Sequence, residues 1–476
     1  MENQPIQILL AEDKIQYRKE QNELLKTVLE YRFFSPWRGI TSVESDYSLQ
    51  NDANLELYIT NQCNQNCEYC YLQKYPSLYP KGNDPKTILN NLEILYQYII
   101  GNNFFIPEID MFSGEIWHTQ FGLDILNLTL RYTQLGLNFG HILISSNCSF
   151  VNSPESWHQI QSYIDEFKKM GKPIIFSISV DGKVIDEAMR PRRNNEKYTD
   201  EYYDNLFAFA KYNSFYFHPM VSAHSVHLWK ENFDWWKKMH NYYDLPLHQM
   251  MMLEVRNDEW TEQAIKDYCD FITYVADDFL YDICKGDIKK MANATANVRN
   301  INSPSLIDGY LPWAITNTDT FIGCTIATHL TVRLGDLAIC PCHRTAYDKY
   351  LYGRFIVEDD TIVDIEACNP QMAIKVLMGN VMVANPKCDT CLYAPTCLGG
   401  CYGSQLEATG DPFFPIKSVC NLYKAKYSTI FNYYKEKGMI DYYKTFSAQE
   451  LGSNRVREIV ELYSKWEAQK DGLGKC

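Results

Sequence analysis

The amino-acid sequence predicts an α/β protein in which parallel strands alternate with crossover helices, as in a partial or full α/β barrel. Short apolar runs of strand length recur along the first 290 residues, and segments with apolar residues at helical spacing lie between them. Strands that alternate with helices favour a parallel sheet covered by helices. A region rich in cysteine, glycine and proline follows between Cys324 and Cys420. We expect metal ligands, more than apolar burial, to hold that region together.

The elements are expected in a regular order. Apolar residues at helical spacing predict a first helix over residues 12–32, and alternating apolar residues predict a strand over 55–60. Further strands are expected over residues 106–111, 141–145, 173–180, 215–221 and 250–255. Helices are expected over residues 87–100, 121–135, 156–170, 201–212 and 229–240, and again over 423–437 and 455–469.

Composition and charge narrow the class of protein. The chain has 476 residues, of which 46% are hydrophobic and 22% are charged, as in globular proteins of two or three domains. Its net charge is −14, from 45 basic and 59 acidic residues, so we expect neither nucleic acid nor an anionic membrane as a partner. The sequence has no apolar run of the roughly 18 residues that a membrane-spanning helix needs. Its N-terminus lacks the features of a secretory signal, and we therefore expect a cytoplasmic protein.

In the cytoplasm the 16 cysteines are expected to be metal ligands or free thiols, because thiols are kept reduced there. Three of them form the motif Cys63-x3-Cys67-x2-Cys70, just after the strand expected over residues 55–60. Active sites of parallel α/β folds lie on the loops that follow the strands. Three closely spaced thiolates can hold three irons of a [4Fe–4S] cluster and leave the fourth iron open to a small molecule. The alternative is a structural zinc site, although zinc prefers four protein ligands in such sites.

A second group of seven spaced cysteines follows toward the C-terminus. Its pattern is C-x10-G-x4-C, then C-x2-C-x5-C-x3-C, then a last cysteine. The seven residues are Cys324, Cys340, Cys388, Cys391, Cys397, Cys401 and Cys420. Seven thiolates nearly suffice for two more [4Fe–4S] clusters, and Cys342 could supply the eighth. Other interpretations stay open: a pair of zinc ribbons, an iron open to substrate, or a ligand other than cysteine.

The two cysteine patterns together resemble a known family. The Cys63-x3-Cys67-x2-Cys70 loop is similar to that of the radical S-adenosylmethionine (SAM) enzymes, and the seven-cysteine pattern is similar to their SPASM extension. The resemblance implies a partial (β/α)6 TIM-like barrel of radical SAM type followed by a small α+β iron–sulfur SPASM domain. It implies three [4Fe–4S] clusters and SAM as cofactors. The implied segments are an N-terminal helical segment 1–50, a radical SAM core 51–290, a SPASM domain 291–425 and C-terminal helices 426–476.

The resemblance also implies which side chains and loops contact SAM. These residues are Tyr69, Ser113, Gly114, Glu115, Asn147, Ser179 and Arg190. Tyr69 would lie near the adenine, Glu115 would accept a hydrogen bond from the SAM ammonium, and Arg190 would hold the SAM carboxylate. Three alternatives follow from the residues alone. Asn147 and the serine before it could cap a helix, Arg190 could be a surface charge, and Asp181-Gly182 could form only a turn.

The function that the resemblance implies is the modification of a ribosomally synthesised precursor peptide by a 5′-deoxyadenosyl radical. The implied partners are that peptide, a low-potential electron donor such as flavodoxin or ferredoxin, and a separate peptide-recognition protein. No catalytic acid or base can be assigned, and His218, Glu254 and His329 are candidates by position only. Two alternatives remain: an anaerobic sulfatase-maturing enzyme that forms formylglycine, and a non-enzymatic scaffold with zinc in the cysteine sites. Colour separates the last alternative, because d¹⁰ zinc gives a colourless protein.

Overall fold

Contacts divide the chain into two units, each built from three separate stretches. The computed structural model describes residues 4–39, 53–79, 84–118, 121–246, 250–278, 285–288, 290, 326, 328–378, 388, 391–393, 400–445, 460–461 and 463–469, with side chains from residue 13 onward. The first unit comprises Met1–Asn64, Tyr71–Ser177 and Thr325–Asn380. The second comprises Gln65–Cys70, Ile178–Cys324 and Val381–Cys476.

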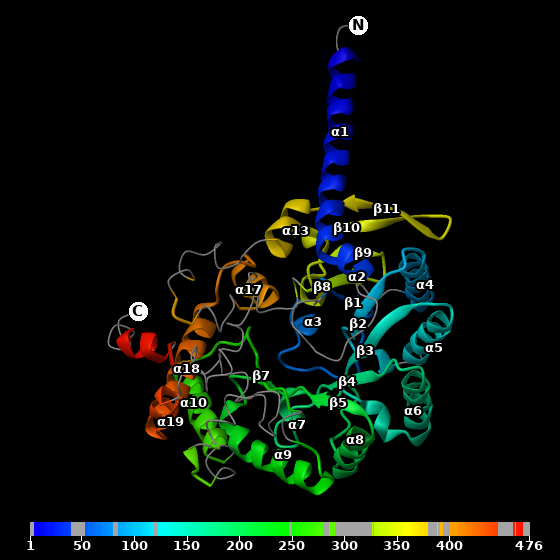
Figure 1. Cartoon of the computed structure of the whole chain (residues 1–476). Coiled ribbons are helices and arrows are strands. Elements are labelled where there is room, and N and C mark those ends of the chain that lie inside the picture. Colours follow the sequence, from blue (N-terminus) through cyan, green and yellow to red (C-terminus); the bar gives the residue numbers. More distant parts are fainter. Residues whose placement is uncertain are drawn as a thin grey trace. The chain divides into compact units, whose positions relative to one another are not determined.

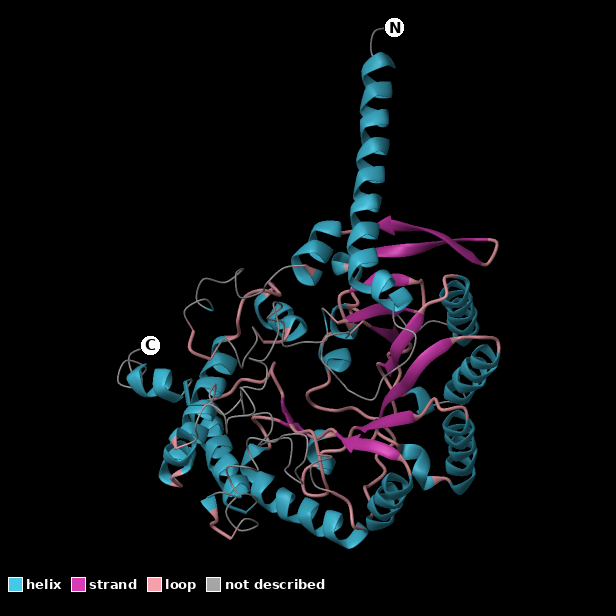
Figure 2. Cartoon of the chain, in the orientation of Figure 1, coloured by secondary structure: helices cyan, strands magenta, loops and turns pink. Residues whose placement is uncertain are grey.

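A largely parallel sheet forms the centre of the first unit (Figure 2, magenta). β1 (Asn54–Tyr58) lies between β2 (Phe105–Phe112) and β8 (His329–Arg333), and both neighbours run parallel to it. β3 (Asn138–Ser146) pairs in parallel with β2, and β4 (Ile174–Ile178) follows. The strand order in this unit is β11-β10-β9-β8-β1-β2-β3-β4. The predicted α/β class is confirmed, and closure of the sheet into a partial barrel stays a prediction.

Alternation along β1 separates an apolar face of the sheet from a polar face. Leu55 and Leu57 are fully buried on one face, and Glu56 lies on the other. Glu56 is in register with Asp110 of β2 on one side and with Thr331 of β8 on the other. The polar face therefore gathers acidic side chains that are nonetheless buried.

Three helices connect the parallel strands of the first unit, and they lie side by side along the sheet in Figure 1. They are α4 (Pro85–Gly101), α5 (Phe121–Gln134) and α6 (Pro154–Lys169). A proline in the first turn starts α4 and α6, where the missing N–H costs nothing. Ser153 caps α6, because its Oγ accepts the Ser156 N–H at 3.3 Å.

The N-terminal segment is a nearly continuous helix in α1 (Gln4–Leu29), η1 (Glu30–Phe34) and α2 (Ser35–Gly39). The helix expected over residues 12–32 is confirmed and starts earlier than expected. Its C-terminal part packs on β11 and α13, and its N-terminal part extends beyond them in Figure 1. Asn22 Oδ1 accepts the Ala367 N–H of β11 at 2.8 Å.

The first part of the cysteine-rich region is a set of strands that the sequence pattern did not predict. β8 is followed by β9 (Ala338–Cys340), β10 (Gly353–Glu358) and β11 (Thr361–Ala367), paired in antiparallel order, and then by α13 (Pro370–Leu377). Their apolar side chains are buried, including Val332, Ile339 and Phe355. The expectation that metal holds this region more than burial is therefore wrong for residues 328–378. These short strands share the core of the main sheet, because β8 pairs with β1.

The second unit is mainly helical. Its longer helices are α8 (Asp200–Tyr212), α9 (Trp229–Tyr243), α10 (Glu262–Ala276) and α18 (Lys417–Glu436). α10 was not predicted from the sequence, although Thr261 caps it and it packs against α18. The helix expected over residues 423–437 is α18, which begins earlier. The last expected helix is helical over 460–461 and 463–469, and residues 455–459 and 462 lie outside the described residues.

The strand expected over residues 215–221 is two strands, β5 (Ser214–Phe217) and β6 (Met220–Val221), because Pro219 interrupts the ladder. β6 pairs in parallel with β7 (Leu253–Glu254), which is shorter than the strand expected over 250–255. Shorter helices complete the chain. They are α3 (Tyr71–Lys74), η2 (Ile116–His118), η3 (Ser149–Asn152), η10 (His343–Thr345) and η11 (Asp348–Tyr350) in the first unit, and α7 (Asp186–Met189), η4 (Val226–Leu228), α17 (Tyr402–Thr409) and α19 (Met439–Lys444) in the second.

Among the described helices, none is long and apolar enough to cross a membrane. The segment boundaries expected at residues 50, 290 and 425 stay predictions.

Candidate functional site

The loop after β2 folds tightly against the loop after β1. Ser113 and Gly114 both have positive φ angles, 78° and 60°. A Cβ added at Gly114 would lie 2.4 Å from the carbonyl oxygen of Gln62 and 2.7 Å from that of Thr60. Ser113 Oγ donates to Thr60 O at 2.7 Å, and Glu115 N donates to Gln62 O at 2.8 Å. Glycine is therefore required at residue 114, and this contact positions the chain just before the first motif cysteine.

One hydrogen-bond network ties the ends of β1, β2 and β3 together. Glu115 is 2% exposed, and its carboxylate accepts the Ser146 Oγ–H at 3.0 Å and the Asn147 N–H at 2.7 Å. Asn147 Nδ2 donates to Asn64 Oδ1 at 2.8 Å, and Asn64 Nδ2 donates to Ser149 Oγ at 2.7 Å. Asn64 directly follows Cys63. The structure thus brings together Ser113, Gly114, Glu115 and Asn147, all of which the sequence predicted as SAM contacts.

The remainder of the cysteine loop, Gln65–Cys70, belongs to the second unit and lies against the segment after α7. Asn66 N donates to Pro191 O at 2.8 Å, and Glu68 N donates to Met189 O at 2.9 Å. These backbone bonds fix the part of the loop that carries Cys67 and Cys70. Both cysteines are half-buried and form no disulfide.

A group of three side chains, of which Asp181 and Arg190 are buried, adjoins this part of the loop. Tyr69 Oη donates to Asp181 Oδ2 at 2.6 Å. Arg190 Nη1 donates to Tyr69 Oη at 2.7 Å and lies 3.4 Å from Asp181 Oδ1. Arg190 is 6% exposed, so the alternative that it is a surface charge is wrong. Its Nε is buried and has no hydrogen-bond partner within the described ranges, so this donor remains open to a ligand.

Asp181 is the centre of this group, although it was not among the predicted SAM contacts. Its side chain is fully buried and also accepts the Met220 N–H at 2.8 Å. Its main-chain oxygen accepts from Asn232 Nδ2 at 2.8 Å and from Trp236 Nε1 at 3.0 Å. Gly182 has φ 119°, and an added Cβ there would lie 2.5 Å from Asn232 Oδ1. Asp181-Gly182 is therefore more than a turn, because it joins the cysteine loop to α9.

Electrostatics couple the cysteine loop to this group. Burial acts to lower the pKa of Arg190, but its electrostatic interactions with Tyr69, Cys67, Asp181 and Asp186 raise it well above its ordinary value. Arg190 therefore stays cationic. Burial, together with repulsion from Asp181, raises the pKa of Asp186 from its ordinary 3.8 to about 7.

Asp186→Asn is expected to stabilise the protein at alkaline pH. In the folded chain Asp186 keeps its proton up to about pH 7, whereas in the unfolded chain it loses the proton near pH 3.8. The contribution of Asp186 to the stability of the wild type is therefore fully present below pH 3.8 and is lost as the pH rises through about 7. The amide cannot ionise and still meets the Asp181 N–H and Tyr203 Oη, which contact Asp186 at 2.9 and 2.8 Å.

We expect the apparent Tm of Asp186→Asn to exceed that of the wild type by about 2–4 °C at pH 8, from about 1–3 kcal/mol, and by less at pH 5. Thermal unfolding followed by circular dichroism at both pH values measures this difference. Asp204→Asn is a matched control, because Asp204 is an exposed carboxylate that also accepts from a tyrosine, Tyr243. An equal Tm difference at pH 5 and pH 8 would refute the assignment of the raised pKa.

The other predicted ligands are spread over both units. Ser179 is half-buried just after β4. Cys340 ends β9 and Cys342 follows it, and both are buried in the first unit. Cys388, Cys391, Cys401 and Cys420 lie in the second unit, where Cys391 N donates to Cys388 O at 3.1 Å and Cys401 and Cys420 line one small cavity. Cys324 and Cys397 lie outside the described residues.

The three acid–base candidates have other roles in the structure. Burial, together with the positive charge of Arg190, lowers the pKa of His218 to about 4. Glu254 is buried, pairs with Lys426 and accepts the Tyr268 Oη–H at 2.5 Å. His329 lies on β8 beside two carboxylates.

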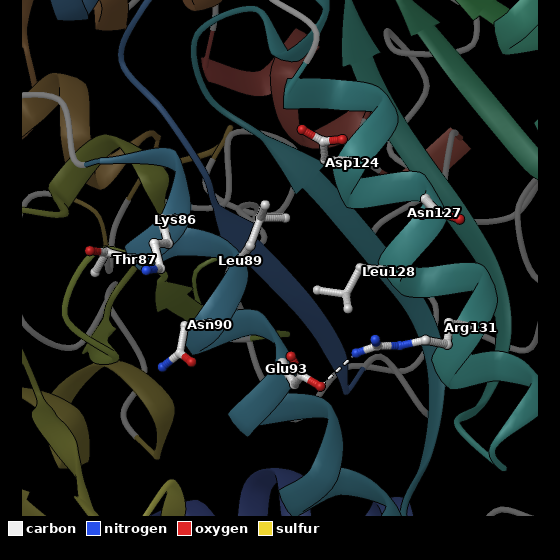
Figure 3. Close-up of a pocket in the computed structure, with 9 residues that line it drawn as sticks. All are labelled: Lys86, Thr87, Leu89, Asn90, Glu93, Asp124, Asn127, Leu128 and Arg131. Carbon is white, nitrogen blue, oxygen red and sulfur yellow. Dashed lines mark hydrogen bonds and ion pairs between the residues drawn. The ribbon is translucent and has the colours of Figure 1, made fainter.

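A wide surface groove of about 590 Å³ lies between α4 and α5 in the first unit, away from the motifs above (Figure 3). Glu93 and Arg131 pair across it at 2.5 Å. Its lining residues include none of the predicted ligands. They are Lys86, Thr87, Leu89, Asn90, Glu93, Asp124, Asn127, Leu128 and Arg131.

Comparison with solved structures shows that the fold is shared with a radical SAM/SPASM enzyme. Native anSMEcpe with bound AdoMet, an anaerobic sulfatase-maturating enzyme, is similar with a TM-score of 0.53 and 14% sequence identity, over 80% of this chain and 98% of that chain. The same protein with AdoMet and the Cp18Cys peptide, or with AdoMet and the Kp18Cys peptide, is similar with a TM-score of 0.53 and 15% identity over the same shares. No protein-family model and no curated protein matches the chain.

Proposed function

We propose that the chain is a radical SAM/SPASM enzyme that modifies a peptide. The observation that carries the proposal is the position of the Cys63-x3-Cys67-x2-Cys70 loop directly after β1 of a largely parallel sheet, in a fold shared with an AdoMet-bound radical SAM enzyme. The loops after β2 and β3 are tied to the same loop through Gln62 and Asn64. Such strand-end loops are where parallel α/β folds build their active sites.

The donor set fits an iron–sulfur cluster and SAM. Three thiols in the motif match the three protein ligands of a [4Fe–4S] cluster with one open iron. Gly114 lets the loop after β2 approach the backbone of Thr60 and Gln62 just before Cys63, and Arg190 Nε is a buried donor without a partner among the described residues. When bound, the cluster and SAM supply a one-electron cleavage that yields a 5′-deoxyadenosyl radical.

The chain's own residues have binding and positioning roles in this proposal. Arg190 would hold the SAM carboxylate in a charge-assisted hydrogen bond, with Asp181 fixing the guanidinium from the other side. Tyr69 would orient Arg190 and present its ring to the adenine. Glu115 would meet the SAM ammonium while it holds the ends of β2 and β3. Ser113, Gly114, Asn147 and Ser179 would supply the polar contacts at the strand ends.

The auxiliary cysteines complete the proposed cofactor set. Cys324, Cys340, Cys388, Cys391, Cys397, Cys401 and Cys420, with Cys342 as the eighth ligand, would hold two further [4Fe–4S] clusters. Cys340 and Cys342 lie two residues apart in extended chain, where alternate side chains share a face. The proposed segments are the N-terminal helix 1–50, the radical SAM core 51–290, the SPASM domain 291–425 and the C-terminal helices 426–476.

The peptide substrate is supported by the comparison structures that hold AdoMet together with a peptide. A ribosomally made precursor peptide is our first candidate. Its partners would be a low-potential flavodoxin or ferredoxin and a separate peptide-recognition protein. A sulfatase peptide that is converted to formylglycine is the second candidate, because the similar structures are of a sulfatase-maturating enzyme.

Anaerobic incubation with SAM, dithionite and each peptide class tests the proposal. We expect one class to increase 5′-deoxyadenosine formation and to gain a mass change that appears only when SAM is present. Mass spectrometry of the peptide and chromatography of the nucleoside measure both. SAM cleavage that no peptide increases, with every peptide mass unchanged, would contradict a peptide-modifying function.

A further inference from the structure

A buried cluster of acidic and histidine side chains lies on the polar face of the sheet in the first unit, and the proposed radical chemistry does not use it. Glu108 and Asp110 are two residues apart on β2, so they share a face. β1 separates β2 from β8, and its residue Asn54 is in register with His329. The three strands thereby bring His329 close to Glu108 and Asp110, although more than 200 residues of sequence separate it from them.

The geometry of the three side chains is that of a coordination site. One ligand atom from each of Glu108, Asp110 and His329 lies within 4.8 Å of the other two. Ligand atoms around one first-row cation are separated by roughly 3–4.4 Å, given metal–ligand distances of about 2.0–2.2 Å. His329 Nε2 lies 3.5 Å from Glu108 Oε1, so a small contraction would close the site.

A second observation is independent of this clustering. Asp110 is 6% exposed, and its Oδ1 is buried without a hydrogen-bond partner among the described residues. A buried carboxyl oxygen without a hydrogen-bond partner is costly, because burial removes its hydration and nothing replaces it. The charged groups that act on Asp110 are Glu56, His329 and Glu108, two of which repel it.

The surroundings hold His329 and Glu108 in orientations that suit metal binding. Thr328 Oγ1 lies 3.0 Å from His329 Nδ1 and engages that nitrogen, which leaves Nε2 directed at the carboxylates. His141 Nε2 lies 2.7 Å from Glu108 Oε2, and Asn54 Nδ2 donates to Glu108 Oε1 at 3.2 Å. Hydrogen bonds to the far side of a ligand, such as those of Thr328 to His329 and of His141 to Glu108, are typical of metal sites.

A proton on His329 alone does not satisfy the cluster. A protonated His329 Nε2 has one N–H to donate, and Glu108 is the carboxylate nearest to it among the ion pairs of the described residues. Glu56 accepts from Thr331 Oγ1 at 2.9 Å and from His343 N at 2.8 Å, so it needs no further partner. Asp110 Oδ1 would still lack a donor. A divalent cation would contact all three side chains at once and would offset the two carboxylate charges.

We propose that Glu108, Asp110 and His329 bind one divalent first-row cation. Two carboxylates and one imidazole form a mixed oxygen and nitrogen donor set that suits Mn²⁺ or Zn²⁺ and does not select for soft metals. None of the three residues belongs to a cysteine motif, and the site requires neither SAM nor peptide, so it can be tested whatever the outcome for the proposed function.

The test uses Mn²⁺ as the probe and the anaerobically purified full chain after treatment with a chelator. Mn²⁺ is titrated into the protein, and the room-temperature electron paramagnetic resonance signal of free Mn²⁺ is recorded. Mn²⁺ that binds to the protein no longer contributes to this signal. We expect one saturable site per chain, weakened roughly 10–100-fold in Asp110→Asn. Asp124→Asn is the matched control, because Asp124 is an exposed acidic residue of α5 in the same unit, and it should bind as the wild type does.

A second variant keeps the test decisive if Asp110→Asn does not fold. His329→Cys replaces the imidazole by a thiolate, so Zn²⁺ should compete at least about tenfold better against Mn²⁺ than in the wild type. An absent saturable site in the wild type would overturn the proposal. So would equal Mn²⁺ affinity in Asp110→Asn and Asp124→Asn, or an unchanged Zn²⁺ preference in His329→Cys.

Discussion

Simultaneous replacement of Cys63, Cys67 and Cys70 by alanine is expected to reduce SAM cleavage to background. These three thiols are the proposed ligands of the cluster that donates an electron to SAM, and no substitute ligand lies between them in the sequence. The C-terminal cysteines lie in other segments, so their iron should be retained. 5′-Deoxyadenosine formed under dithionite, with iron and sulfide per chain, measures both effects.

Cys368→Ala is the control for that triple variant. Cys368 is exposed and lies outside both cysteine patterns, so its loss should change neither the iron content nor SAM cleavage. Continued formation of 5′-deoxyadenosine by the triple variant would remove Cys63, Cys67 and Cys70 from the site. Loss of all iron in the triple variant would show that the auxiliary clusters depend on the first one.

Gly114→Ala is expected to have the second largest effect. The new Cβ would lie 2.4 Å from Gln62 O and 2.7 Å from Thr60 O, and the residue has φ 60°. Backbone atoms cannot move aside as a flexible side chain can, so the loops after β1 and β2 must separate. We expect SAM cleavage to fall roughly 100-fold and the free energy of unfolding to fall by about 2–4 kcal/mol.

Gly171→Ala is the control for Gly114→Ala, because it separates the cost of a positive φ from the cost of a Cβ clash. Gly171 has φ 71°, close to that of Gly114, but an added Cβ would meet nothing within 4 Å. It should cost about 1 kcal/mol and leave SAM cleavage unchanged. If both variants lose the same stability and both keep activity, then the close approach of the two loops has no functional role.

The elements that carry the site could be predicted from local sequence. The strand over residues 55–60, the cysteine loop after it and the Ser113-Gly114-Glu115 loop are each specified within a few residues, and the structure places them at neighbouring strand ends. Periodicity is sufficient for such elements, because each one buries a face that its own residues define. Arg190 was also predicted, although its burial was not.

Contacts between distant residues could not be predicted. Asp181 resembled a turn residue, and its role depends on Tyr69, which lies 112 residues away, and on α9. The strand β8 has an unremarkable alternating sequence, and only its pairing with β1 shows that it belongs to the main sheet. His329 was proposed by position alone. The cluster that it forms with Glu108 and Asp110 exists because three strands come into register, which no local pattern indicates.

The central claim is that this chain cleaves SAM reductively at the Cys63-x3-Cys67-x2-Cys70 loop. The most direct measurement is the anaerobic reaction of the reconstituted wild-type protein with SAM and dithionite, with 5′-deoxyadenosine and methionine quantified together. Both products should form in equal amounts, and neither should form without reductant or in the triple cysteine variant. A brown, iron-loaded protein that leaves SAM intact, or that forms the same products without the three cysteines, would contradict it.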